Sequence, residues 1–211
     1  MKRAVIFDLD GTLIDSAGGL MAAVNHVMRR HGLPERHREE IMRLTGNGSR
    51  VLIERCIGAG HPSFESILGE YVAHYAANAF VDTAPYPGIA DLVATLRSNG
   101  IHVGVATNKD EHIARDLVAR FFPGPFPVRG GGEGHPRKPN PKGVLDLCEE
   151  FGAIPKECLY VGDTAVDAET AAAAGMPFVL CSWGFRPRGD LERLGKVVDE
   201  PREIAVAAGI G

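Results

Sequence analysis

Short apolar runs alternate with longer stretches of helical spacing along most of this chain. After residue 88, the apolar positions Ile89, Leu92, Val93 and Leu96 follow the i, i+3, i+4, i+7 spacing of one helix face. The alternation predicts an α/β fold, a Rossmann-like doubly wound and mostly parallel sheet with helices on both faces. Strands are predicted at 4–7, 101–106, 126–128, 158–161, 178–181 and 197–198, and helices at 110–121, 142–151 and 165–174.

One block departs from this alternation. Between residues 15 and 82 no segment has a strand pattern, and four helices are predicted, the first with Ser16 as its N-cap. A chain of 211 residues fits one domain, or one domain with an insertion. Long insertions in surface loops cost little conformational entropy. We therefore predict an α/β core of residues 1–14 and 83–211, with an inserted all-helical cap of residues 15–82.

Composition narrows the classes of function. The net charge of -4 and the pI of about 6.1 give no electrostatic reason to expect nucleic acid or an anionic membrane as a partner. The four cysteines are widely spread without a C-x-x-C pair, so we expect free thiols rather than disulfides or a zinc site. Asp8 and Asp10 interrupt the first apolar run, which argues against a signal peptide or a spanning helix. We expect a cytoplasmic protein, either a monomer or a dimer.

The first predicted strand leads into Asp8-Leu9-Asp10-Gly11-Thr12. Residues two apart in an extended chain share one side, so both carboxylates are expected to point the same way. That arrangement is costly without a partner such as a divalent cation or a phosphoryl group. Gly11 permits a sharp turn, and Thr12 adds a hydroxyl. A capped turn is the simpler alternative, whereas an EF-hand is excluded because the glycine comes too early and the final glutamate is missing.

Further polar residues lie close to the ends of other predicted strands. Thr107 and Asn108 follow the second strand, Asp163 follows the strand at 158–161, and Lys138 lies in a Gly/Pro-rich loop. Taken singly, these residues are explained by a helix cap, a turn and a surface lysine. Ligands of open parallel sheets bind outside the carboxyl ends of the strands. We therefore expect all of them to meet the two acids of the first strand at one edge of the sheet.

These residue types suit phosphoryl transfer. Mg²⁺ prefers a few carboxylates together with water and phosphate oxygens, and Asp8, Asp163 and a backbone carbonyl near Asp10 can supply such ligands. We expect Asp8 to be the nucleophile that forms an aspartyl-phosphate. Asp10 is expected to protonate the leaving oxygen and then to deprotonate the attacking water.

The phosphoryl oxygens need positive or hydrogen-bonding partners. We expect Thr107 and Lys138 to hold them, and the backbone N–H of Asn108, at the start of a helix, to add to this anion site. Asp167 lies one helical turn after Asp163 and is expected to orient Lys138 or a metal-bound water. An exposed helix acid is the alternative for Asp167.

These motifs resemble those of the haloacid dehalogenase superfamily of phosphohydrolases. The segment from Asp8 to Thr12 is similar to its first motif, Thr107 to its second, Lys138 to its third, and Gly162-Asp163-Thr164 with Asp167 to its fourth. The resemblance implies a helical cap and Mg²⁺ as cofactor. It also implies a phosphatase, because the dehalogenases of the superfamily lack the second acid, here Asp10. The loop of residues 130–135 carries more glycine and fewer acids than the resemblance leads us to expect.

Three further segments, Thr45-Gly46-Asn47-Gly48, Pro85-Tyr86-Pro87-Gly88 and Thr107-Asn108-Lys109, resemble those of phosphoglycolate phosphatases. The resemblance implies a small phosphorylated metabolite, 2-phosphoglycolate, as substrate. Its carboxylate needs a cation, and we expect Arg50 of the cap to supply it, a surface arginine being the alternative.

Other functions remain compatible with the motifs. They are an inorganic pyrophosphatase, a sugar-phosphate phosphatase or phosphomutase, and, outside enzymes, a receiver-type module or an inactive binding protein. A receiver has no cap insertion, so residues 15–82 argue against it. Whether Trp183 and Phe185 contact the substrate or the cap stays open at this level.

Overall fold

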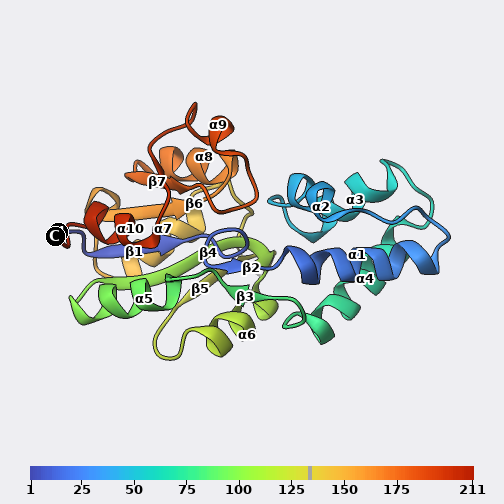
Figure 1. Cartoon of the computed structure of the whole chain (residues 1–211), viewed down its shortest axis with the longest axis horizontal. Coiled ribbons are helices and arrows are strands. Elements are labelled where there is room, and N and C mark those ends of the chain that lie inside the picture. The colour runs from blue at the N-terminus through green and yellow to red at the C-terminus, as the bar shows by residue number, and fades with distance from the viewer. Residues whose placement is uncertain (133–134) are drawn as a thin grey trace.

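The computed structural model describes residues 1–132 and 135–211, and within them six strands form one parallel sheet (Figure 1). The order across the sheet is β5-β4-β1-β6-β7-β8, and each neighbouring pair is parallel. The predicted Rossmann-like, mostly parallel sheet is therefore confirmed. The strands are β1 (Ala4–Phe7), β4 (His102–Asp110), β5 (Val128–Gly131), β6 (Cys158–Gly162), β7 (Phe178–Cys181) and β8 (Val197–Val198).

Helices cover both faces of this sheet. Side chains alternate along a strand, and β1 divides its four buried residues between two hydrophobic clusters. Val5 and Phe7 pack on the side of α5 (Ile89–Ser98), α6 (Glu111–Phe121) and α10 (Pro201–Ala207). Ala4 and Ile6 pack on the side of α7 (Lys142–Glu150) and α8 (Ala165–Ala174). A 3-10 turn (Pro155–Glu157) precedes β6, and the short α9 (Arg188–Leu191) follows β7.

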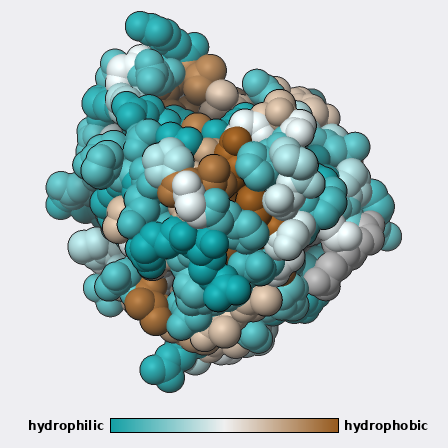
Figure 2. All heavy atoms as spheres, turned by 90° about the vertical axis from the view of Figure 1, so that its right-hand side faces the viewer, coloured by the Kyte–Doolittle hydropathy of each residue, from teal (hydrophilic) through white to brown (hydrophobic). Residues whose placement is uncertain are grey.

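Four helices lie beyond the right-hand end of the sheet in Figure 1, and we call them the helical segment. They are α1 (Ala17–Arg30), α2 (Arg38–Leu44), α3 (Ser49–Ile57) and α4 (Phe64–Asn78). The chain passes into and out of this segment through β2 (Ile14–Asp15) and β3 (Ala84–Pro85), which pair antiparallel. The predicted cap limits at residues 15 and 82 lie next to this pair and stay a prediction. Seen from the same end, the surface is mainly hydrophilic, with a smaller hydrophobic area near its centre (Figure 2).

Three local predictions were wrong. The strand β4 continues to Asp110 instead of ending at residue 106, with a register shift between Ala106 and Asp110, so α6 begins only at Glu111. The strand expected at 126–128 lies at Val128–Gly131. Ser16 occupies the predicted N-cap position of α1 but makes no side-chain cap bond, and its hydroxyl donates instead to a carboxylate oxygen of Asp10 at 2.5 Å.

The topology brings three strand ends together. The chain places β1 first, then adds β4 and β5 on one side and β6 to β8 on the other. The carboxyl ends of β4, β1 and β6 are therefore neighbours, at the point where the strand order reverses and such sheets bind ligands. Among the described residues, no helix is both long enough and apolar enough to cross a membrane.

Candidate active site

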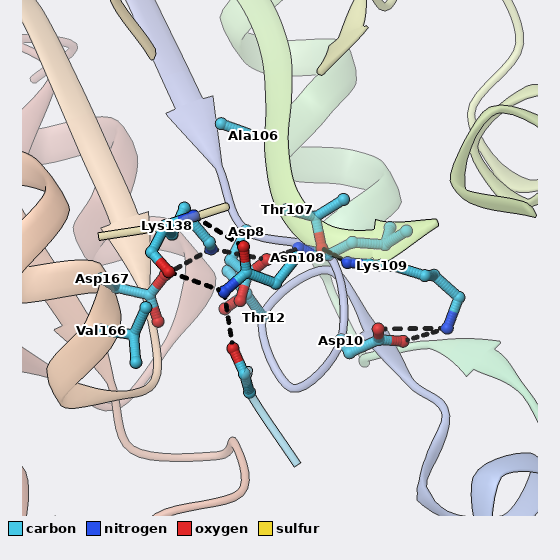
Figure 3. Close-up of polar contacts among 12 residues, drawn as sticks. Asp8, Asp10, Thr12, Ala106, Thr107, Asn108, Lys109, Lys138, Val166 and Asp167 are labelled. Carbon is cyan, nitrogen blue, oxygen red and sulfur yellow. Dashed lines mark hydrogen bonds and ion pairs between the residues drawn. The ribbon is translucent and has the colours of Figure 1, made fainter. Parts of the chain in front are cut away.

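Asp8 comes directly after β1 and faces an ammonium group. One of its carboxylate oxygens lies 3.0 Å from Nζ of Lys138, and its Oδ1 accepts a hydrogen bond from the N–H of Leu9 at 2.7 Å. Burial, opposed by Lys138, raises the pKa of Asp8 from 3.8 to about 6. The sequence led us to expect Asp8 and Lys138 at one edge of the sheet, and Figure 3 shows Asp8, Lys138 and Asp167 grouped on one side of the site.

Asp167 is fully buried and fixes Lys138 in this position. Its Oδ1 accepts a hydrogen bond from Lys138 Nζ at 2.7 Å, and its Oδ2 accepts from the hydroxyl of Thr164 at 2.7 Å. Although burial disfavours both charges, each group shifts the other: the pKa of Lys138 is raised well above its ordinary value, and that of Asp167 is lowered. The hydroxyl of Tyr160 accepts a further bond from Lys138 at 3.0 Å. Asp167 is therefore buried against Lys138 and is not the exposed helix acid that was the alternative.

Asp163 completes a group of three buried acids. Carboxylate oxygens of Asp8, Asp163 and Asp167 lie within 4.8 Å of one another. Burial, together with the charges of Asp167 and Asp8, raises the pKa of Asp163 well above its usual range. Its Oδ2 accepts the N–H of Phe185 at 2.7 Å, and Thr12 Oγ1 lies 3.5 Å from its Oδ1.

This group fits a divalent cation. Burial, with a smaller contribution from repulsion between the crowded carboxylates, raises the pKa values of Asp8 and Asp163, and a divalent cation among them would remove that cost. Oxygen donors are the ligands of hard cations. The predicted ligands were Asp8, Asp163 and a backbone carbonyl near Asp10, and the group adds the carboxylate of Asp167 to the two acids.

The carboxylate of Asp10 points to different partners. Lys109 Nζ donates to its Oδ1 and Oδ2 at 2.9 and 3.1 Å, and the hydroxyl of Ser16 donates to Oδ1 at 2.5 Å. Figure 3 shows Asp10 and Lys109 on the side of the site away from Lys138. The two acids of the first motif therefore have separate surroundings. Asp8 belongs to the acidic group, and Asp10 is held apart by an ion pair.

Asn108 acts through its side chain, which corrects the prediction for its backbone. It lies within β4 and not at the start of a helix. Its Oδ1 accepts the backbone N–H of Lys138 at 2.7 Å, and its Nδ2 donates to the carbonyls of Lys138 and Gly46. Thr107 lies beside it, with its hydroxyl oxygen accepting the N–H of Lys109 at 3.2 Å. Asn108 thus positions the backbone of Lys138. Of the glycine-rich loop singled out in the sequence, residues 130–135, positions 133 and 134 lie outside the described residues.

A pocket lies between the sheet edge and the helical segment. The sheet side contributes both acids of the first motif and the polar end of β4, whereas the helices contribute mainly apolar and aromatic side chains. Trp183 donates from its indole to the carbonyl of Thr12 at 3.1 Å. The lining residues are Asp8, Asp10, Leu20, Thr45, Gly46, Gly48, Ser49, Leu52, Tyr71, Val72, Tyr75, Thr107, Asn108, Lys109, Asp110, Ile113, Thr164 and Phe185.

Arg50 is not part of this lining. Its guanidinium pairs with Glu65 at 2.9 Å, packs 5.0 Å from the ring of Phe64, and is more than half exposed. Arg50 lies on α3, whose buried face carries Leu52, Ile53 and Cys56 instead. The structure thus does not support the expectation that Arg50 binds the carboxylate of the substrate.

Sequence reasoning missed Lys109, Ser16 and Tyr160. Lys109 stands in the Thr107-Asn108-Lys109 segment that was singled out, but its direction depends on the irregular end of β4. Ser16 was assigned to a helix cap because serine before a helical pattern is a common N-cap. Tyr160 lies within an apolar strand pattern, so nothing in the sequence distinguished its buried hydroxyl from core packing.

Comparisons with known proteins agree with this geometry. Residues 2–175 match the family model of haloacid dehalogenase-like hydrolases. The phosphoglycolate phosphatase of Pseudomonas putida is 33% identical over 215 residues, covering 97% of this chain and 79% of the relative. That of Cereibacter sphaeroides is 39% identical over 191 residues, covering 86% of each.

A solved structure is similar as well. The crystal structure of a candidate phosphoglycolate phosphatase from Lactobacillus delbrueckii subsp. bulgaricus superposes with a TM-score of 0.92 at 28% identity, over 99% of both chains. The family match over residues 2–175 and this superposition both agree with the fold described above. The chain belongs to the haloacid dehalogenase-like hydrolase family.

Proposed function

We propose that this chain is a Mg²⁺-dependent phosphatase that hydrolyses a small phosphomonoester, 2-phosphoglycolate, through an aspartyl-phosphate intermediate. One observation carries the proposal: the buried carboxylate of Asp8 lies 3.0 Å from Lys138 and beside two further acids. Such a carboxylate has the charge compensation that a nucleophile needs near an anionic phosphate. The curated relatives named phosphoglycolate phosphatase support the choice of substrate.

The reaction has two balanced halves. Asp8 attacks phosphorus while the bond to the glycolate oxygen breaks, and Asp10 gives its proton to that oxygen. A water then attacks the phosphorus of the aspartyl-phosphate, Asp10 takes a proton from the water, and the bond from Asp8 breaks to release inorganic phosphate. Lys138 and Thr107 hold the phosphoryl oxygens throughout. Asp8, Asp163 and Asp167, with a backbone carbonyl near Asp10, would hold Mg²⁺, which would supply positive charge to the phosphoryl group.

The helical segment acts as the cap in this proposal. With the predicted limits the cap comprises residues 15–82; its helices contribute one wall of the pocket, so its closure excludes bulk water from the intermediate. Two arginines of the α/β part lie against it, and one of them, Arg186, holds it by hydrogen bonds. Arg186 donates to the carbonyls of Met42 and Thr45, and Arg137 donates to the carbonyl of Asn108, next to the Gly46–Gly48 turn.

The test is phosphate release with Mg²⁺ from 2-phosphoglycolate, pyrophosphate and several sugar phosphates, repeated in EDTA. We expect the highest kcat/KM with 2-phosphoglycolate and no release in EDTA. If pyrophosphate or a sugar phosphate is preferred, the proposed reaction stands and the choice of 2-phosphoglycolate as substrate is wrong. Release that persists in EDTA would remove the Mg²⁺ dependence, and no release from any of them would overturn the proposal.

A further inference from the structure

The pocket contains one feature that the proposed reaction does not yet use, the side chain of Lys109. Among the described residues that line the pocket, Lys109 is the only lysine, arginine or histidine. The lining that comes from the helical segment is apolar, aromatic or uncharged, so the cap offers no positive charge there. A substrate with a second anionic group therefore has one cation available to it in this space.

Lys109 is held at the boundary between the sheet and the cap. Its side chain is 5% exposed, and its Nζ contacts the carboxylate of Asp10 at 2.9 Å and the hydroxyl of Tyr75, on α4, at 2.7 Å. An ammonium has three donors. The donors now meet both oxygens of Asp10 and the tyrosine hydroxyl, so a ligand would take the place of the longer contact, the one to Oδ2 of Asp10 at 3.1 Å.

The chemistry of the substrate determines what this donor meets. In 2-phosphoglycolate the carboxylate carbon is attached to the carbon that carries the leaving oxygen. Asp10 protonates that leaving oxygen in the proposed reaction, so a group in contact with Asp10 lies next to the carboxylate. Lys109 is such a group, at 2.9 Å.

The other cations near the site have different partners. Lys138 contacts Asp8 and Asp167. Arg137 and Arg186 donate to backbone carbonyls of Asn108 and of the helical segment, and Arg50 lies outside the pocket. None of these side chains lines the pocket.

We infer that Lys109 is the specificity residue of this enzyme: it binds the substrate's carboxylate and selects phosphomonoesters with an anionic group one carbon beyond the leaving oxygen. The inference rests on the proposed function and adds the residue that recognises the non-reacting end of the substrate. Because Lys109 also holds Asp10, substrate binding and the placement of Asp10 are coupled through one side chain.

The experiment compares two substrates that differ only at the recognised end, 2-phosphoglycolate and 2-hydroxyethyl phosphate. The kcat/KM of each is measured for the wild type and for Lys109→Met, with Lys156→Met as a control that removes an exposed lysine. Loss of Asp10 positioning lowers both values alike, so the ratio isolates recognition. The Lys109→Met variant lacks one partner of a buried charge pair, so we expect the preference for 2-phosphoglycolate to fall at least about 30-fold. At 1.4 kcal/mol per tenfold, this is about 2 kcal/mol.

The outcomes separate this inference from the proposed function. A wild-type preference that survives in Lys109→Met overturns the inference and leaves the proposed function standing. A wild type that hydrolyses both substrates equally overturns the inference and the choice of phosphoglycolate, but leaves a phosphatase. Release from neither substrate overturns both. If circular dichroism shows that Lys109→Met does not fold, Lys109→Gln gives the same ratio, with the same expected loss.

Discussion

Gly11, inside the first motif, allows a prediction with a matched control elsewhere in the chain. Its φ is +80°, and a Cβ there would lie 2.4 Å from Oδ2 and 2.8 Å from Cγ of Asp163. Gly60 has a similar φ of +74°, but a Cβ there would have no atom within 4 Å. Alanine at either position therefore meets the same left-handed strain, about 1–2 kcal/mol. Only Gly11→Ala also displaces Asp163.

The displacement sets the size of the effect. Asp163 is fully buried and accepts the N–H of Phe185 at 2.7 Å, so its carboxylate cannot move without losing a hydrogen bond. A hydrogen bond to a buried charged group contributes about 1.5–3 kcal/mol. We expect Gly11→Ala to lower the free energy of unfolding by about that much more than Gly60→Ala does.

Urea denaturation in EDTA measures this difference without metal. A titration of activity with Mg²⁺ then gives the half-saturating concentration, which should rise in Gly11→Ala and stay at the wild-type value in Gly60→Ala. Equal stabilities of the two variants, with equal Mg²⁺ requirements, would refute the idea that Gly11 is needed for the approach of Asp163.

Three further predictions concern the same site. The pKa of Asp8 is raised to about 6, so the metal-free protein loses up to about 3 kcal/mol of stability as the pH rises from about 4 to about 6. Mg²⁺ should therefore raise Tm more at pH 7.5 than at pH 5. An equal or smaller rise at pH 7.5 contradicts this. Tyr160→Phe removes an acceptor 3.0 Å from Lys138 and should lower the free energy of unfolding by about 1–3 kcal/mol in urea; an unchanged value speaks against the contact. Arg50→Ala should leave KM for 2-phosphoglycolate within about twofold, because the exposed pair with Glu65 lies outside the pocket; a large rise in KM would restore the role expected from sequence.

The sheet and the acidic group could be predicted because both follow from local patterns. Short apolar runs define the strands, a parallel sheet aligns their carboxyl ends, and the residues just after β1 and β6 must then meet. Asp8 and Asp163 are such residues. Asp167 follows from the helix that begins after Asp163, because one helical turn returns its side chain to the same edge.

The pocket wall could not be predicted in the same way. Whether Arg50 faces the pocket depends on how α3 packs between its neighbouring helices, and that packing does not follow from the sequence pattern. The direction of Lys109 depends on the register shift at the end of β4, which a one-dimensional pattern does not contain. The hydrogen bond from Ser16 to Asp10, six positions earlier, was missed because the two residues come together only where the chain turns at Gly11.

The central claim is that Asp8 carries the phosphoryl group, and a rapid-quench experiment tests it directly. Wild type and Asp8→Asn are mixed with 2-phosphoglycolate labelled with ³²P in the presence of Mg²⁺, quenched in acid within milliseconds, and examined for protein-bound label. We predict acid-stable label on the wild type, located by mass spectrometry at Asp8, and neither label nor turnover in Asp8→Asn. Normal turnover by Asp8→Asn, or label on a different residue of the wild type, would contradict the account.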